Sequence, residues 1–524
     1  MRSMTKAVSR VPRLVRLPDQ EIDVSSALIS FHACTLLAFV MVLTSDQYLH
    51  WFMIPVTLGG ALIGIDAVDW FRRRVDIFDP VGILGLLGVH VFFLVPILHV
   101  YWDSWMQWIV PPDDWRPWVG LMAGLNLMGL IVYRLTRSLI FRIGKPGLQR
   151  SVWWIEGKRF PIVLGAALLV TAVFQLQVYR QMGGIIGYIT SYETGVEDGT
   201  MSESFQGMGW IFMISESFPI LALMGYAFYA RNRPSARTWG MLLLVLLVFF
   251  VLKLFFGGLR GSRSNTIWGL FWGVGIIHFW IRRVPQRLIY IGIVFLVGFI
   301  YIYGFYKAGG LDAFNEFASS GASAELQQET GRSLEGAILG DLGRTDVQAF
   351  VLYRLLRPDS DYQYALGRTY VGAAAILIPK SIWPDRPIHK VKEGTEVLYG
   401  RGSYVPGVRV SSRVYGLAGE TMLNFGPYFV PLAFSVLGLV VGRVRYWLAT
   451  WEPYDVRMFF VPFLVNLCFV LLVSDSENIL FFLIKNGAVP MFVIWLTVRI
   501  TEKSLVAPAS AIDSAVLRRK PALN

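Results

Sequence analysis

Two runs of the chain place cations, aromatic rings and carboxylates close together. The first, residues 378–390, reads IPKSIWPDRPIHK, and the second, residues 408–426, reads VRVSSRVYGLAGETMLNFG. Cations bind phosphate oxygens and aromatic faces stack on sugar rings, so this mixture suits a sugar linked to a phosphate. A solvated charged surface accounts for it equally well, and both interpretations stay open. The candidate substrate-binding residues are Lys380, Trp383, Arg386 and Tyr415.

Two residues of these runs are candidate general bases. Glu420 is the carboxylate nearest to Pro427, where the chain is predicted to re-enter the membrane. A carboxylate with a raised pKa can take the proton of a sugar hydroxyl, although an ordinary ion pair with Arg413 would also explain Glu420. His389 is the second candidate, because an unperturbed imidazole titrates near neutral pH.

Five arginines are candidate phosphate ligands, because a guanidinium fork binds phosphate oxygens with two donors at once. Two of them lie in LRGSRSN, residues 259–265, and one lies in YRQMGGIIGY, residues 179–188. The alternative for both runs is that the arginines extend to the membrane surface and pair with lipid phosphates. The five candidates are Arg260, Arg263, Arg180, Arg409 and Arg413.

Three ionisable residues, Glu216, Lys253 and Lys485, interrupt apolar segments. Because charge in lipid is costly, each is expected to face the interior of a helix bundle or a water-filled cavity, and ion or proton transport becomes a rival function. Asp359 and Asp361 are spaced like paired metal-binding carboxylates, but a match of two residues in a polar loop is too short to predict a metal site. A nucleotide cofactor is not predicted either, since we find no Walker or Gly-rich nucleotide motif.

The composition is that of a membrane protein. Hydrophobic residues make up 55% of the 524 and charged residues 16%, and the mean hydropathy is +0.52, which indicates a polytopic chain. The net charge of +12 comes from short basic runs beside apolar segments. Membrane topology therefore explains the charge better than a nucleic-acid partner does.

A membrane span needs about 20 apolar residues, and this criterion predicts an all-α bundle of about twelve spans. The spans are residues 26–43, 52–70, 81–101, 118–135, 161–178, 209–230, 238–256, 266–281, 288–306, 427–448, 458–473 and 479–500. The predicted organisation is an N-terminal segment (1–25), nine spans (26–306), a large loop (307–426), three spans (427–500) and a tail (501–524). Within the loop, residues 371–383 are apolar but too short to span, so we expect a short helix on the membrane surface.

Lys and Arg concentrate in alternate connections, as the positive-inside rule requires. Basic runs follow every second predicted span and recur in the tail, at residues 72–74, 134–150, 231–237, 282–287, 443–445 and 518–520. Both termini are therefore predicted to be cytoplasmic, and the large loop to lie on the outer face of the membrane. Nucleotide-activated donors and ATP are cytoplasmic, so a lipid-linked substrate suits the loop better.

The order of these parts resembles the Wzy-type polysaccharide polymerases, the oligosaccharide repeat-unit polymerases of O-antigen assembly. The resemblance is carried by RQMGGIIGY, GLRGSRSN, LIPKSIWPDRP and GETMLNFGPY, which lie between Arg180 and Tyr428. It implies a GT-C-like bundle with short extracytoplasmic helices over a lipid-facing cleft, in the bacterial inner membrane. The partners that it implies are an oligosaccharide linked to undecaprenyl diphosphate, membrane lipid and a chain-length regulator protein.

The same resemblance implies a glycosyltransferase reaction. A growing glycan would move from undecaprenyl diphosphate to the non-reducing sugar of the next lipid-linked repeat unit, without a metal and with inversion at the anomeric carbon. Arg260 and Arg263 would then engage the diphosphate, whose negative charge as leaving group needs electrostatic stabilisation. Arg180, Arg409 and Arg413 are further candidates, and Glu420 or His389 would take the acceptor proton.

Two rival functions stay open. An O-antigen ligase has similar architecture and the same donor, but transfers the finished glycan to the lipid A core. A flippase or transporter for the lipid-linked oligosaccharide is the rival from another class, suggested by the charges within the spans, although we find neither the repeated halves nor the helices broken at the midplane that are common in transporters.

Overall fold

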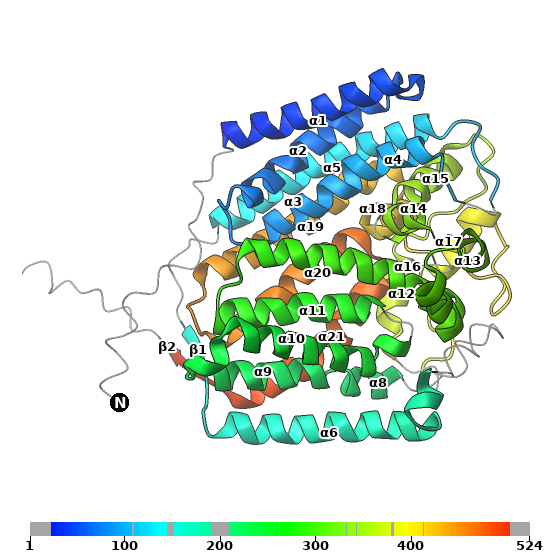
Figure 1. The fold of residues 1–524 in the computed structure, drawn as a ribbon. Helices are drawn as coiled ribbons and strands as arrows, with labels where there is room; N and C mark the ends of the chain where they lie inside the picture. The colour runs from blue at the N-terminus through cyan, green and yellow to red at the C-terminus, as the bar shows by residue number, and fades with distance from the viewer. Residues whose placement is uncertain are drawn as a thin grey trace, which may run out of the picture.

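Long helices run side by side through most of the molecule (Figure 1). The computed structural model describes residues 23–106, 109–143, 151–189, 209–260, 263–331, 333–341, 343–378, 382–411 and 413–502. Within these ranges, ten helical segments are long and apolar enough to cross a membrane. They are Val24–Thr44 (α1), Met53–Phe71 (α2), Pro80–Trp102 (α3, η3 and α4), Arg116–Ile143 (α5), Arg159–Gln181 (α6), Gly209–Ala230 (α8 and α9), Trp239–Arg260 (α10 and η5), Gln286–Ser320 (α12), Pro427–Thr450 (η8 and α19) and Ser476–Thr497 (α21).

The outer surface of this bundle is apolar. Side chains such as Leu36 on α1, Leu169 on α6, Leu247 on α10 and Val294 on α12 are all more than half exposed. Large contiguous apolar surfaces are rare on soluble monomers and are the normal lipid-facing surface of membrane helices. The chain is therefore an all-α, multi-pass membrane protein, as its composition predicts.

The predicted count of twelve spans is not confirmed. The predicted span 266–281 corresponds to α11 (Arg263–Ile276) and η6 (Ile277–Ile281), and the predicted span 458–473 corresponds to α20 (Val461–Val473). The helix α20 has only 13 residues, and most of them are buried against other helices. Both segments lie within the bundle, and α11 packs against α10 and α20.

Short helices gather at one end of the bundle, which we call the loop end (Figure 1). The chain enters this region through α12, which breaks at Gly309 and Gly310, where φ of Gly310 is +68°. The predicted loop start at Lys307 is close to this break. The helices that follow are α13 (Ala324–Thr330), α14 (Leu334–Gly336), η7 (Ala337–Asp341), α15 (Thr345–Leu356), α16 (Arg368–Ala375), α17 (Val391–Tyr399) and α18 (Gly416–Phe425).

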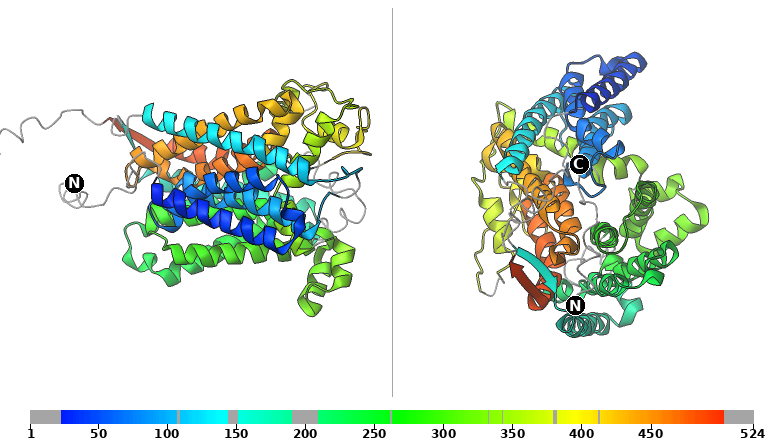
Figure 2. Two further views of the ribbon diagram at one scale, coloured as in Figure 1. Left: turned by 90° about the horizontal axis from the view of Figure 1, so that it is seen from above. Right: turned by 90° about the vertical axis from the view of Figure 1, so that its left-hand side faces the viewer.

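The opposite end carries a two-stranded antiparallel sheet, and we call it the sheet end (Figure 1). Strand β1 (Ser151–Ile155) pairs with β2 (Val498–Glu502), so the chain beyond α5 and the chain beyond α21 meet there. Seen from this end, α1 and α6 lie at opposite edges of the bundle, with the helices nearest to the C-terminus between them (Figure 2). The helix α21 runs from the loop end to the sheet end, with one side buried in the bundle and side chains such as Phe492 and Trp495 exposed on the other.

Candidate functional site

At the start of α21, residues of the loop form hydrogen bonds and ion pairs with the bundle. Asp475 precedes the helix, and its Oδ1 accepts the backbone N–H groups of Tyr415 and Gly416, each at 2.9 Å. Its Oδ2 forms an ion pair with Lys390, whose Nζ also donates to the carbonyl oxygen of Arg413 at 3.1 Å. We call the three residues at this helix start the α21 hub: Asp475, Ser476 and Glu477.

Glu420 lies on α18 against the hub and is only 3% exposed. Its Oε1 accepts the hydroxyls of Ser476 (2.6 Å) and Thr369 (2.8 Å), and its Oε2 accepts the backbone N–H of Ser476 (2.6 Å). Burial, and secondly the negative charge of Asp475, raise the pKa of Glu420 to about 7. The carboxyl can therefore exchange a proton near neutral pH, but both of its oxygens already have protein donors.

His389 is the more accessible of the two predicted bases. Its Nδ1 lies 2.7 Å from Oε2 of Glu477, and the two side chains are 28% and 26% exposed. A carboxylate next to one imidazole nitrogen favours the proton there and leaves the other nitrogen as the base, which is the logic of catalytic His–acid pairs. Glu477 is thus a functional candidate that the sequence analysis missed. The polar run Ser474 to Glu477 before the last apolar segment was the available signal.

A second group of polar side chains is buried inside the bundle. Oε1 of Glu216 accepts a hydrogen bond from Arg260 at 2.6 Å, and its Oε2 lies 2.7 Å from Nζ of Lys485. Asn265 donates from Nδ2 to the same Oε2 at 2.5 Å, and its Oδ1 accepts from Nζ of Lys253 at 3.0 Å. We call these five residues the charge cluster.

Breaks in the helices bring the charge cluster together. Glu216 lies between α8 (Gly209–Ser215) and α9 (Phe218–Ala230), which form one membrane segment interrupted at this residue. Arg260 ends η5 (Gly258–Arg260), in the turn between α10 (Trp239–Phe255) and α11. Gly257 in that turn has φ of +123°, and a Cβ there would lie 2.6 Å from Cδ of Glu216, so only glycine fits both the backbone and the space.

The charge cluster and the α21 hub share one helix. Lys485 follows Ser476 by nine residues on α21, a rise of about 14 Å at 1.5 Å per residue. Glu216 follows the loop-end start of α8 by seven residues, a rise of about 10 Å. The cluster therefore lies inside the bundle, at a distance from the loop end, whereas the hub lies at the loop end itself.

The structure places the other predicted phosphate ligands as follows. Arg263 begins α11 and is half-buried, whereas Arg180 is exposed in the last turn of α6. Arg409 is exposed and forms a backbone bridge with Val405. Arg413 is half-buried next to the hub, where its carbonyl oxygen accepts from Lys390. Arg260 is the one that the structure brings into the charge cluster.

The predicted substrate-binding residues also differ in their surroundings. Trp383 is exposed, and Tyr415 is fully buried. Arg386 donates from Nη1 to three carbonyl oxygens at the end of α16, those of Ala375, Ile376 and Ile378. Lys380 lies outside the described residues. The predicted surface helix at 371–383 corresponds in part to α16, which ends at Ala375.

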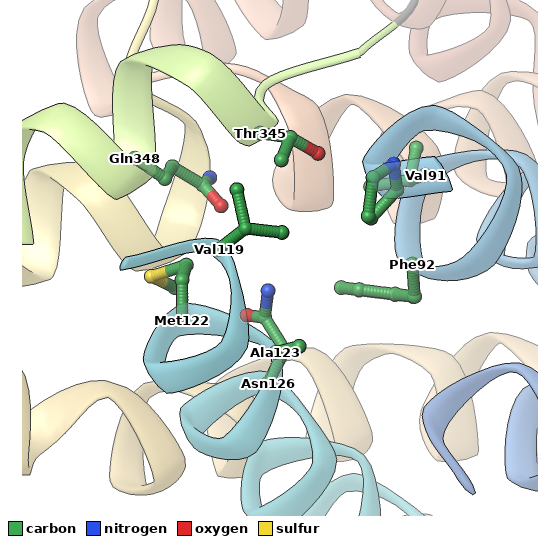
Figure 3. A pocket seen from close by; sticks show the side chains of 9 residues that line it. Val91, Phe92, Val119, Met122, Ala123, Asn126, Thr345 and Gln348 are labelled. Atoms are coloured by element: carbon green, nitrogen blue, oxygen red, sulfur yellow. The ribbon is translucent and has the colours of Figure 1, made fainter. Parts of the chain in front are cut away.

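A cavity of about 10 Å³ lies between α3–α4, α5 and α15 (Figure 3). Asn126, Thr345 and Gln348 contribute polar atoms to its lining, and Oδ1 of Asn126 has no hydrogen-bond partner. A cavity of this size holds about one water molecule. It is too small for a sugar, so it is not part of the candidate site.

The described residues include no group of three His, Cys, Asp or Glu side chains that could hold a metal ion. Comparisons of the chain with models of protein families, with curated proteins and with solved structures find no match.

Proposed function

We propose that the protein is a membrane glycosyltransferase, a polysaccharide polymerase that extends a glycan carried on a lipid diphosphate. The observation that carries the proposal is that a single helix, α21, contacts both candidate bases at its start and contributes Lys485 to the charge cluster of Arg260. In this proposal the proton acceptor lies at the loop end and the cationic site lies deeper in the bundle, so that a lipid-linked sugar at the membrane surface would lie between them.

The distribution of charge supports an orientation with the loop end in the periplasm and both termini in the cytoplasm. The basic runs at residues 72–74, 231–237 and 282–287 follow α2, α9 and η6 respectively, on the side of the sheet end. The positive-inside rule assigns that side to the cytoplasm. In this proposal α11 and α20 complete twelve membrane segments in a GT-C-like arrangement of the bacterial inner membrane.

In the proposed reaction an acceptor hydroxyl oxygen attacks the anomeric carbon of the growing glycan. The bond from that carbon to the diphosphate oxygen breaks, and the lipid diphosphate leaves with the bonding electron pair. Cations of the charge cluster stabilise the negative charge of the leaving group, a contribution that is large in a water-poor site. A single displacement of this kind inverts the anomeric carbon and requires no metal.

The acceptor proton goes to His389 in this proposal. Its ring is partly exposed beside Glu477, whereas the oxygens of Glu420 are occupied by Ser476 and Thr369. Glu420 then has a structural role instead. It joins α18 and α16 to the hub and so fixes the position of the loop over the bundle.

The test is a polymerisation assay with purified protein and lipid-linked repeat units in liposomes. We expect a ladder of lengthened lipid-linked products, and loss of the ladder in Arg260→Ala at unchanged membrane insertion. Transfer of glycan only to a lipid A core acceptor would instead identify a ligase. Intact repeat units crossing the bilayer without lengthening would contradict the proposal.

A lipid-linked oligosaccharide transporter is the second candidate function, and one observation favours it. The membrane segment of α8 and α9 is interrupted at the buried carboxylate of Glu216, and interrupted helices with buried charges are typical of transporter binding sites. The liposome assay separates the two candidates, because a transporter moves the substrate without changing its length.

A further inference from the structure

Lys253 differs from the other two cations of the charge cluster, because Arg260 and Lys485 each contact the carboxylate of Glu216 and Lys253 does not. It lies in the last turn of α10 and is 1% exposed. Its Nζ has three donors, and the hydrogen bond that it forms goes to Oδ1 of Asn265, a neutral amide, at 3.0 Å. A buried ammonium without a bonded anion is strongly unfavourable in a membrane interior, so its retention requires a reason.

Within the described residues, no direct ion pair joins Lys253 to the carboxylate of Glu216. Glu216 is already contacted by Arg260, Lys485 and Asn265. Within the described residues, the charge cluster therefore contains one carboxylate for two ammonium groups and a guanidinium. Cations outnumber anions at a largely buried site, and an anionic ligand would correct this imbalance.

The surroundings of Lys253 suit a ligand with an apolar tail. The helix α10 carries Lys253 on its buried side, while Leu243, Leu247 and Val251 of the same helix are exposed on the lipid-facing surface. The cluster lies about 10 Å below the start of α8 at the loop end, within reach of a lipid headgroup that enters the bundle from the membrane surface.

We propose that Lys253 and Asn265 form part of a membrane-embedded phosphate site, in which Glu216 orients Lys485 and Arg260 and the phosphate-bearing headgroup of a lipid binds Lys253. The phosphate oxygens accept from Nζ of Lys253 and from the cations around Glu216, and the lipid tail lies along α10. The inference rests on the proposed function only where the ligand is taken to be the lipid-linked donor.

The test is a binding titration of the purified full-length protein in detergent, followed by tryptophan fluorescence, with farnesyl diphosphate as probe and farnesol as its uncharged control. We expect farnesyl diphosphate to bind and farnesol to bind at least tenfold more weakly, since it lacks the phosphate groups. Lys253→Met should lower the affinity for farnesyl diphosphate by roughly tenfold to a hundredfold, the range for losing a hydrogen bond to a charged group.

The melting temperature separates a ligand role from a structural one. Lys253→Met removes a cation without a bonded carboxylate and fills the same space, so we expect the melting temperature to stay or to rise. Lys485→Met is the matched control, because it removes a cation that is paired with Glu216. That variant should lose both affinity and thermal stability.

A second variant tests the site by adding an anion rather than removing a cation. Asn265→Asp would give Lys253 a carboxylate partner, so we expect farnesyl diphosphate binding to fall at least tenfold. The proposal is overturned if Lys253→Met and Asn265→Asp both bind farnesyl diphosphate as the wild type does, or if farnesol binds equally well.

Competition by other anions identifies the source of the headgroup. Displacement of farnesyl diphosphate by phosphatidylglycerol as well as by pyrophosphate assigns the site to phosphate groups of lipids in general. Displacement by pyrophosphate alone assigns it to diphosphate lipids. The binding titration does not measure sugar transfer, so its result is independent of the polymerisation assay. Binding without polymerisation would contradict the polymerase and retain this site. Polymerisation together with unchanged binding in Lys253→Met would retain the polymerase and contradict this site.

Discussion

At the scale of single residues, the loop end depends on carboxyl groups whose surroundings differ. Glu420 is buried with hydroxyl and N–H donors, and Asp475 is buried with Lys390 and two backbone N–H groups. Burial raises the pKa of Asp475 as well as that of Glu420. Of these three carboxyl groups, Glu477 is the partly exposed one, and it lies next to an imidazole. Environment, rather than residue type, therefore separates the two buried carboxyl groups from the one that the proposed mechanism uses.

The raised pKa of Glu420 makes the stability of the protein depend on pH. The folded state binds the proton of Glu420 more tightly than the unfolded state does, so its contribution is present below the ordinary pKa near 4.5 and is lost as pH rises through about 7. Glu420→Gln should therefore lose less stability than the wild type between pH 5 and pH 8, because glutamine does not ionise. Melting temperatures in detergent at the two pH values measure this difference. Parallel pH curves for the two proteins would contradict it.

The pairing of His389 with Glu477 gives a kinetic prediction. His389→Ala should lower the polymerisation rate by roughly 10²- to 10⁴-fold, the usual contribution of a general base. Its melting temperature should change little, because the side chain is partly exposed. Glu477→Gln should lower the rate less, since the imidazole remains. A normal rate in His389→Ala would remove this residue from the proposed mechanism.

At the scale of elements, glycines set how closely the helices approach. Gly438 and Gly442 on α19 form a GxxxG pattern that faces α5. A Cβ on Gly438 would lie 2.7 Å from the carbonyl oxygen of Tyr133, and one on Gly442 would lie 2.8 Å from that of Arg137. Such patterns allow membrane helices to pack backbone against backbone. The same α5 residue, Arg137, forms a buried ion pair with Asp66 of α2, so the three helices form one unit.

Substitution at this contact should destabilise the bundle. Gly438→Val or Gly442→Val would force α5 and α19 apart, at a cost of about 1–3 kcal/mol for overpacking. Gly298→Val on α12 is the control, because a Cβ there has no neighbour within 4 Å. Thermal unfolding in detergent should show a lower melting temperature for the α19 variants and little change for the control. Equal shifts in all three would contradict the packing argument.

At the scale of the whole molecule, the two ends of the bundle differ in kind. The loop end carries short helices joined to α21, and the sheet end carries β1 and β2 (Figure 1). The proposed function requires that these ends face opposite compartments, with the loop end outside the cytoplasm.

Labelling of introduced cysteines tests this orientation. The two native cysteines, Cys34 and Cys468, are both buried, so background labelling should be low. Val408 at the loop end is 84% exposed and Ile500 at the sheet end is 54% exposed. The two test variants are therefore Val408→Cys and Ile500→Cys. A membrane-impermeant maleimide added to cells with a permeable outer membrane should label the first variant and spare the second. The reverse pattern would place the loop in the cytoplasm and end the proposal.

The sequence by itself determined the membrane character and the helical class. Both follow from a local property, namely the length of the apolar runs. It also placed Glu216, Lys253 and Lys485 in the bundle interior, and the structure confirms that all three are buried. The cost of charge in lipid acts on each residue separately, so one chain position suffices for that inference.

Only the tertiary structure decided which of these residues meet. Glu216, the pair Lys253 and Arg260, and Lys485 come from three membrane segments, and no spacing along the chain relates one segment to another. The same holds for the hub, where Glu420 contacts Ser476 and His389 contacts Glu477 across more than 50 residues. Such contacts depend on how the helices pack and where α8 and α10 end, because packing brings together side chains whose separation in sequence carries no signal.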